Sequence, residues 1–278
     1  MRVGILGLGL MGSSLALALR RARPDLSLVG SDADVVTMRR ALALGLVEEG
    51  DPRTADVVVL AVPIAAMPEA LAGLSGRGGI VTDLASTKAH VMRWAAAAGV
   101  DLVGGHPMCG REQAGIDAAD PDIFRGAPWV LTRDEPAVTG LVRAVGSSPV
   151  FMDAERHDRL VAGVSHAAFV LSAAYVLALS GDADWEAMQR VAGSGFRDMS
   201  RLAAGDPGLY AAIVSTNREH IADALRAVEA AVARARRHLE AGDGRLVELL
   251  EEARRTRERW ARGPNGVPAA ADERGSQR

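Results

Sequence analysis

The sequence predicts an α/β fold in which a doubly wound parallel sheet is followed by an all-helical region. Short apolar runs alternate with amphipathic stretches over the first half of the chain, as they do when crossover helices connect parallel strands. A glycine-rich turn follows the first of these runs. After Met152 the strand pattern stops, and helical periodicity continues to about Trp260. We therefore expect one domain over residues 1–152, a helical domain over 153–262 and a disordered tail over 263–278.

The expected strands are short apolar runs. The run at 57–62 is apolar throughout, which is typical of a strand buried on both faces of a parallel sheet. The other strands are expected at 3–6, 26–30, 79–82, 102–104, 129–131 and 150–152. Amphipathic stretches between these runs predict helices at 11–21, 35–44, 64–71, 88–97 and 137–144.

The helical region has recognisable ends and breaks. Acidic residues between Asp153 and Asp158 favour the start of a long helix, because negative charge is stabilised at a helix N-terminus. Glycine-containing turns at 205–208 and 242–244 interrupt the helical pattern. Residues 160–179 carry no formal charge and are long enough to span a membrane, but Ala, Gly, Ser and His166 would make insertion weak. We expect a core helix here, buried on all sides, and no membrane span.

The composition predicts a soluble protein of a reducing compartment. The chain has 278 residues, of which 49% are hydrophobic and 24% charged, as is ordinary for a globular protein. The net charge of −3 gives no reason to expect nucleic acid or an anionic membrane as a partner. The single cysteine, Cys109, excludes an internal disulfide and suits the cytoplasm. Because a strand pattern begins at Arg2 without a charged and apolar leader, we expect no signal peptide.

The glycine-rich turn predicts a dinucleotide site. It reads Gly7-Leu8-Gly9-Leu10-Met11-Gly12 and lies between the first expected strand and the first expected helix. Gly7 permits the tight turn, Gly9 lets the backbone approach a pyrophosphate, and Gly12 allows the helix to pack closely on the strand. Asp32 follows Gly12 by 20 residues, at the end of the second expected strand. A carboxylate at this spacing accepts hydrogen bonds from the ribose hydroxyls and repels a 2′-phosphate. The sequence therefore predicts a Rossmann domain that binds NAD, with Leu10 and Met11 also at the cofactor; the alternative is a glycine turn without a nucleotide.

Three further stretches carry polar residues that a nucleotide-binding domain does not require. They are Asp83-Leu84-Ala85-Ser86-Thr87-Lys88, His106-Pro107-Met108-Cys109-Gly110-Arg111-Glu112, and Arg156-His157-Asp158 with Ser165-His166. The first two follow expected strands, at the sheet edge where doubly wound folds bind ligands. Together with the later Gly195-Phe196-Arg197-Asp198-Met199-Ser200-Arg201, these motifs resemble those of the prephenate and arogenate dehydrogenases of tyrosine biosynthesis. The resemblance runs from Met1 to about Trp260.

The resemblance implies an NAD-dependent oxidative decarboxylation of a cyclohexadienol. It implies that His106 hydrogen-bonds the substrate 4-hydroxyl and acts as general base, a task suited to an imidazole near neutral pH. Ser86 would hold the same hydroxyl or the nicotinamide amide, and Arg201 would pair with a substrate carboxylate. Ser165 and His166 would line the substrate pocket, although His166 also fits a helix core. The helical domain would form the centre of a homodimer.

The other motif residues also have structural alternatives. His106 can be a loop histidine, Ser86 can cap the helix that begins near Lys88, and Arg201 can be a surface residue. Lys88 is the only lysine in the chain. It is expected to form a structural ion pair, with Glu112 as the partner, and not to act in catalysis.

The sequence departs from the family at one position. The family's pocket motif S-H-L-P-H reads Ser165-His166-Ala167-Ala168-Phe169 here, so Phe169 replaces a histidine that in many members lies near the substrate side chain. The choice between prephenate and arogenate therefore stays open, with prephenate favoured by its frequency in the family. A β-hydroxyacid dehydrogenase is a weaker alternative, because that class uses a lysine in its helical domain and this chain has none after Lys88. A non-catalytic nucleotide-binding protein is a third.

Overall fold

A computed structural model of the chain describes residues 1–109 and 113–263. The chain forms two compact units, Met1–Ile221 and Ala222–Arg278. The tail expected after residue 263 lies outside the described residues. The expected domain boundary near Asp153 falls inside the first unit and stays a prediction.

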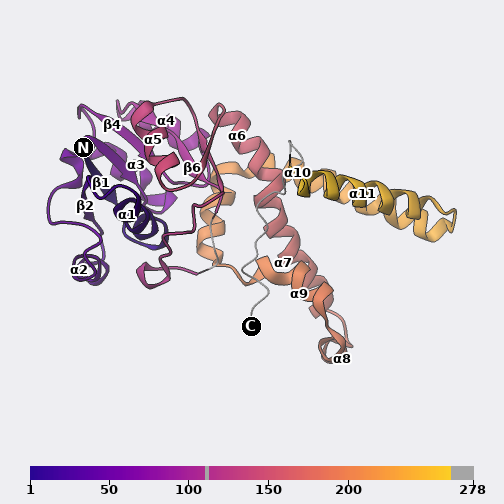
Figure 1. The fold of residues 1–278 in the computed structure, drawn as a ribbon. Coiled ribbons are helices and arrows are strands. Elements are labelled where there is room, and N and C mark those ends of the chain that lie inside the picture. Colours follow the sequence, from indigo (N-terminus) through magenta and orange to yellow (C-terminus); the bar gives the residue numbers. More distant parts are fainter. Residues whose placement is uncertain (110–112, 264–278) are drawn as a thin grey trace. The chain divides into compact units, whose positions relative to one another are not determined.

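A parallel sheet forms the centre of the first unit (Figure 1). Its strands are β1 (Arg2–Leu6), β2 (Ser27–Ser31), β3 (Val57–Leu60), β4 (Ile80–Asp83) and β5 (Leu102–Val103), in the spatial order β2-β1-β3-β4-β5. Every neighbouring pair is parallel. Five of the seven expected strands therefore lie in the parallel sheet, with ends that differ by one or two residues.

Helices cover both faces of this sheet. They are α1 (Leu10–Ala22), α2 (Val35–Ala43), α3 (Met67–Ala72), which a 3-10 turn at Ile64–Ala66 precedes, and α4 (Ala89–Ala97). Val57 and Val59 of β3 belong to the core that contains α1, whereas Val58 and Leu60 belong to the core that contains α3 and α4. Because alternate residues of one strand enter different cores, the sheet is doubly wound, as predicted.

A second, three-stranded sheet was not expected. It consists of β6 (Gly105–Pro107), β7 (Pro128–Leu131) and β8 (Ser148–Phe151), with α5 (Pro136–Ala144) between β7 and β8. The runs at 129–131 and 150–152, taken as members of the parallel sheet, belong here instead. One residue, Gly104, separates β5 from β6, and β6 then pairs antiparallel with β7. A strand of three residues is too short to show a period in the sequence.

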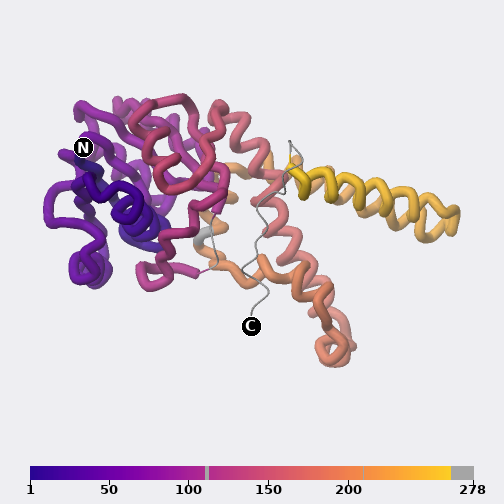
Figure 2. The backbone as a smooth tube through the Cα atoms, in the orientation of Figure 1, coloured from indigo at the N-terminus to yellow at the C-terminus, as the bar shows by residue number. Residues whose placement is uncertain are grey.

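The helical part of the first unit begins where the acidic residues predicted. Asp153 caps α6 (Ala154–Val161) by accepting a hydrogen bond from the Arg156 N–H. A π-helical turn at Ala162–His166 joins α6 to α7 (Ala167–Ser180). Next come α8 (Trp185–Val191), α9 (Ser194–Ser200), a 3-10 segment at Arg201–Ala204, and α10 (Pro207–Ala241). Figure 2 follows this path as a tube.

The long apolar helix is less buried than expected. The segment Ala154–Ser180 is long and apolar enough to cross a membrane, and one third of its most apolar window is buried. In α7 only Ala167 and Ser172 are buried, and Leu177 is 70% exposed. The expectation of a helix buried on all sides is therefore wrong for the chain taken alone.

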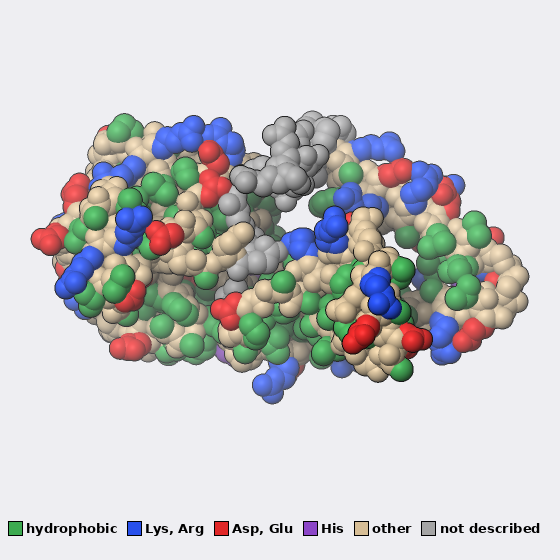
Figure 3. Space-filling view, turned by 90° about the horizontal axis from the view of Figure 1, so that it is seen from below, with side chains coloured by type: hydrophobic (Ala, Val, Ile, Leu, Met, Phe, Trp, Pro, Cys, Tyr) green, Lys and Arg blue, Asp and Glu red, His purple; other side chains and the backbone are tan. Residues whose placement is uncertain are grey.

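The described residues of the second unit form two helices joined by a turn. It contains the end of α10 and α11 (Arg245–Ala261), joined by the predicted turn, in which Gly242 and Gly244 adopt positive φ. Apolar side chains of these two helices lie exposed, and hydrophobic groups are visible on the surface in Figure 3. The exposed residues include Val232, Leu239, Val247, Leu250 and Trp260.

Candidate active site

A pocket of about 490 Å³ opens at the carboxyl ends of the parallel strands. The segments after β1, β2, β3 and β4 all contribute to it. In doubly wound folds ligands bind at this edge, where the connections that follow two neighbouring strands lead to opposite faces of the sheet. Of the residues predicted from the sequence, seven line this pocket: Gly7, Gly9, Leu10, Met11, Asp32, Ser86 and His106.

The glycine turn is shaped for a phosphate group. Gly7 has φ of +94°, which side chains rarely tolerate. A Cβ on Gly12 would lie 1.9 Å from the Gly7 carbonyl oxygen, so this position has no room for a side chain. A Cβ on Gly9, by contrast, would meet no other atom of the fold within 4 Å. Gly9 begins α1 without a capping side chain, so the first N–H groups of the helix are available to an anion.

Asp32 is held at the rim of this turn. One carboxylate oxygen accepts a hydrogen bond from the Leu8 N–H at 2.6 Å, and the other accepts one from the Asp34 N–H at 2.8 Å. Each carboxylate oxygen has a second lone pair, so Asp32 retains acceptor capacity toward the pocket.

A buried ion pair fixes the strand that carries His106. The Asp83 carboxylate accepts hydrogen bonds from Gly105 N–H at 2.9 Å and Ala85 N–H at 3.0 Å, and it forms an ion pair with Lys88 Nζ. Both charged side chains are fully buried. Burial lowers the pKa of Lys88 from 10.5, and the nearby Asp83 charge opposes this shift. Lys88 is therefore a structural partner, as expected, but of Asp83; Glu112 lies outside the described residues.

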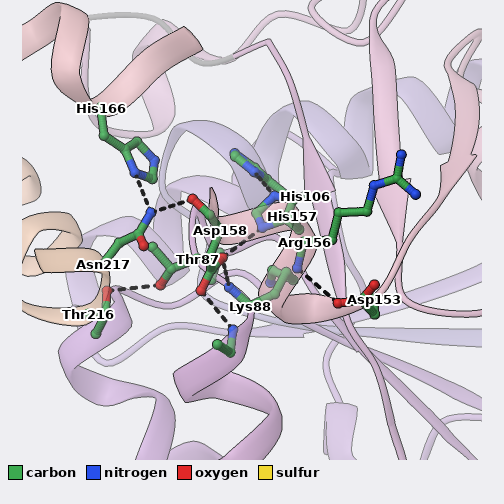
Figure 4. A network of polar contacts seen from close by, with 12 residues as sticks. Thr87, Lys88, His106, Asp153, Arg156, His157, Asp158, His166, Thr216 and Asn217 are labelled. Carbon is green, nitrogen blue, oxygen red and sulfur yellow. Dashed lines mark hydrogen bonds and ion pairs between the residues drawn. The ribbon is translucent and has the colours of Figure 1, made fainter. Parts of the chain in front are cut away.

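His106 lies on β6 and is 8% exposed. Its Nδ1 is 2.8 Å from His157 Nε2, and His157 Nδ1 is 2.7 Å from an Asp158 carboxylate oxygen (Figure 4). Burial, followed by the neighbouring His157, Lys88 and His166, holds the pKa of His106 well below 6.5. The ring is therefore neutral at physiological pH, as a general base must be. His106 lies on a strand and not in a loop, and its role as general base stays a prediction.

Asp158 is a residue whose role the sequence did not reveal. Its carboxylate accepts hydrogen bonds from the N–H groups of Lys88 at 2.7 Å and Ala89 at 2.9 Å, and so caps α4. Burial raises the pKa of this carboxyl, but the hydrogen bonds from His157, Lys88 and Ala89 outweigh that effect and leave it below 3.8. Because Asp158 accepts the first N–H groups of α4, this helix does not need the side chain of Ser86 as its cap.

Asn217 is a second residue that the sequence did not reveal. Its backbone is non-helical inside α10, with φ of −137° and ψ of 28°. The amide nitrogen donates to the Asp158 carbonyl oxygen at 2.8 Å and lies 3.1 Å from His166 Nδ1. Because an amide nitrogen only donates, His166 Nδ1 accepts and the ring proton is on Nε2. Burial lowers the pKa of His166 from 6.5 to about 4.

Three predicted substrate residues do not line the pocket in the chain taken alone. His166 is buried in the π-helical turn, whereas Ser165 and Arg201 are exposed. Phe169, the position that departs from the family motif, stacks on Tyr210 with an interplanar angle of 15°.

Comparisons with known proteins agree with these features. The family model "Prephenate dehydrogenase, nucleotide-binding domain" matches residues 15–146, and "Prephenate dehydrogenase, dimerization domain" matches residues 153–252. The prephenate dehydrogenase of Lactococcus lactis is 31% identical over 78% of this chain and 65% of its own length. The prephenate dehydrogenase of Bacillus subtilis is 29% identical over 78% of this chain and 64% of its own length. The chain thus spans just under two thirds of the length of these relatives.

Two solved structures are similar over almost the whole chain. Prephenate dehydrogenase from Aquifex aeolicus, in complex with hydroxyphenyl propionate and NAD+, has a TM-score of 0.86 at 27% identity, covering 93% of this chain and 98% of that one. Synechocystis arogenate dehydrogenase has a TM-score of 0.81 at 29% identity, covering 94% and 100%.

Proposed function

Because the chain belongs to the prephenate dehydrogenase family, we propose that it catalyses the NAD-dependent oxidative decarboxylation of prephenate to 4-hydroxyphenylpyruvate. The substrate ring gives up a hydride while the proton of its 4-hydroxyl moves to a base. Carbon dioxide then leaves as the ring becomes aromatic, and the proton returns to the phenolate oxygen. NAD, when bound, supplies the hydride acceptor. Arogenate, which would give tyrosine, is the alternative substrate.

One observation carries this proposal: a buried, neutral histidine lines the same pocket as the glycine turn. His106 accepts the hydroxyl proton, since Nδ1 is engaged by His157 and Nε2 remains for the substrate. Ser86, which lines the pocket beside it, holds the same hydroxyl or the nicotinamide amide. No other group of the protein has to change its protonation in the reaction.

The residues around the glycine turn fit NAD. The first N–H groups of α1 and the open space above Gly9 suit a pyrophosphate, with Leu10 and Met11 beside it. Asp32 suits a ribose that carries free hydroxyls, because its charge repels a 2′-phosphate.

Arg201, His166 and Ser165 are the proposed substrate-binding residues. A guanidinium is the best partner for a carboxylate, which prephenate and arogenate both carry. His166 offers a fixed N–H donor on Nε2, as its contact with Asn217 requires. The exposure of Arg201 in the single chain is consistent with a site that closes when the substrate binds or a second chain covers it.

We also propose that the protein is a cytoplasmic homodimer. The poorly covered apolar surface of α7 supports an interface between two copies, because a single chain leaves most of it outside the core. The single cysteine is compatible with a reducing compartment.

A direct test is the appearance of NADH absorbance when the protein is mixed with NAD and either prephenate or arogenate. We expect turnover with prephenate and a lower kcat/KM with arogenate. The reverse preference would identify an arogenate dehydrogenase. A folded protein that binds NAD and converts neither compound would refute the proposed function.

A further inference from the structure

We propose that His157 and Asp158 are positioning residues that hold the ring proton of His106 on Nδ1, so that the Nε2 lone pair faces the substrate. This inference rests on the proposed function, in which His106 accepts a proton. The three side chains form a chain of contacts that leads from the pocket to the first turn of α4 (Figure 4).

The direction of each hydrogen bond in this chain of contacts follows from the charge of Asp158. Its ionised carboxylate can only accept, and it takes the Lys88 and Ala89 N–H groups as well as the contact from His157 Nδ1. His157 Nδ1 therefore carries a proton. In a neutral ring the other nitrogen, Nε2, is then an acceptor, and the partner at 2.8 Å, His106 Nδ1, must be the donor. The lone pair of His106 is left on Nε2.

The opposite arrangement would require a doubly protonated His157, which would donate to both neighbours. His157 is fully buried, and a buried charge is costly unless it is needed for pairing. Asp158 does not need this charge, because two backbone N–H groups and the positive end of α4 already compensate it. The arrangement in which His157 accepts from His106 therefore buries no charge beyond that of Asp158.

The same contacts fix how the His106 ring is oriented. The His106 and His157 rings meet edge to face, with centroids 5.0 Å apart and planes at 74°. The backbone of His106 is held by β7, and the strand begins at Gly105, whose N–H is bound by Asp83. Neither the ring nor its backbone has freedom to present Nδ1 to the pocket.

His157 and Asp158 also act when His106 takes up the proton of the substrate hydroxyl. Once Nε2 of His106 is protonated, the ring becomes an imidazolium, and its Nδ1–H bond to His157 becomes a charge-assisted hydrogen bond. The Asp158 carboxylate lies one ring further away and stabilises this charge without taking the proton itself. Catalytic histidines that are oriented by a carboxylate behave in this way.

Nitrogen-15 NMR of the histidine rings tests the arrangement without any substrate. With six histidines in the chain, His106→Asn and His157→Gln spectra assign the two signals. At neutral pH we expect both rings to carry their proton on Nδ1 and to have a bare Nε2. A His106 ring protonated on Nε2, or a doubly protonated His157, would overturn the proposal.

Two polar substitutions at position 157 then separate positioning from stability. His157→Asn places an amide near the former Nδ1, so it can keep the contact with Asp158 but not the one with His106. His157→Gln reaches the former Nε2 and can keep an acceptor for His106. We expect kcat to fall about 10²-fold or more for Asn and less than about tenfold for Gln, with KM for NAD unchanged in both.

Thermal unfolding of the same two variants completes the test. If His157 had only a structural role, total activity would fall only in proportion to the folded fraction of each variant. The kcat of the folded Asn variant would then equal that of the parent, and this result would refute the proposal. If a variant does not fold, the NMR result on the parent protein decides. Failure of the proposed function is a separate outcome, because a parent that converts neither substrate still reveals its ring protons.

Discussion

The backbone N–H of Lys88, at the start of α4, donates a 2.7 Å hydrogen bond to the Asp158 carboxylate on α6. This contact ties the part of the chain that holds the glycine turn to the start of the helical region. The same carboxylate contacts His157, and the Asp158 carbonyl oxygen accepts from Asn217. One residue thus connects α4, α6 and α10.

The role of His106 is tested by His106→Asn. Asparagine keeps a polar side chain near the contact with His157 but removes the basic nitrogen. We expect kcat to fall by about 10²–10⁴-fold, the usual range for general acid–base catalysis, with nearly unchanged NAD affinity. In the parent, kcat should be constant above pH 6.5 and fall only well below it, because burial keeps the ring neutral. A folded variant with the parent's rate would show that another group is the base.

The buried histidines also predict that stability depends on pH. The pKa of His166 is about 4 in the folded chain, against 6.5 for an ordinary histidine. Above pH 6.5 both states are neutral and stability is fully present; as the pH falls toward 4, only the unfolded chain gains the proton. This difference should cost about 3 kcal/mol of unfolding free energy, measured with urea at a series of pH values.

The control for this effect is His166→Asn, which removes the titrating ring but can still accept a hydrogen bond from Asn217. Its stability should fall less steeply between pH 6.5 and 4 than that of the parent. Equal slopes would mean that His166 is not a buried neutral histidine.

Cofactor choice should depend on the charge of Asp32. Asp32→Ser removes both the charge and the acceptors for ribose, and should lower the preference for NAD over NADP by at least about tenfold, or roughly 1.4 kcal/mol. Asp32→Asn keeps one acceptor oxygen and isolates the contribution of charge. Values of kcat/KM for both cofactors give the answer. If the serine variant discriminates as well as the parent, Asp32 does not contact the ribose.

The proposed dimer predicts an effect of a charge on α7. Leu177 is 70% exposed in the single chain, and Leu177→Arg should shift the protein to monomers, because an unpaired charge cannot be buried in an apolar interface. Leu44→Arg is the matched control, since Leu44 is 48% exposed at the end of α2 and outside the helical region. Light scattering measures both. A parent that is an active monomer at assay concentration would rule out this interface.

Features that depend on residues close together in the sequence could be predicted from it. The glycine turn, Asp32 and the central strands were all found, because apolar runs and turn residues indicate them locally. Asp158 was expected to favour its own helix with its charge, and it caps a different one instead. Asn217 stands in an ordinary helical pattern, and nothing near it in the sequence indicates a partner on α6. Hydrogen bonds between distant segments leave no period in the sequence, so the seven predicted residues that line the pocket could be found and the contacts behind His106 could not.

The burial of Lys88 has a practical consequence for chemical labelling. It carries the only ε-amino group in the chain, and the fold encloses it completely. A reagent that acylates lysine side chains can therefore reach this amine only when the fold around it opens locally. The rate at which Lys88 is modified therefore reports how often this part of the core opens, and it can be followed by mass spectrometry without any substitution in the chain.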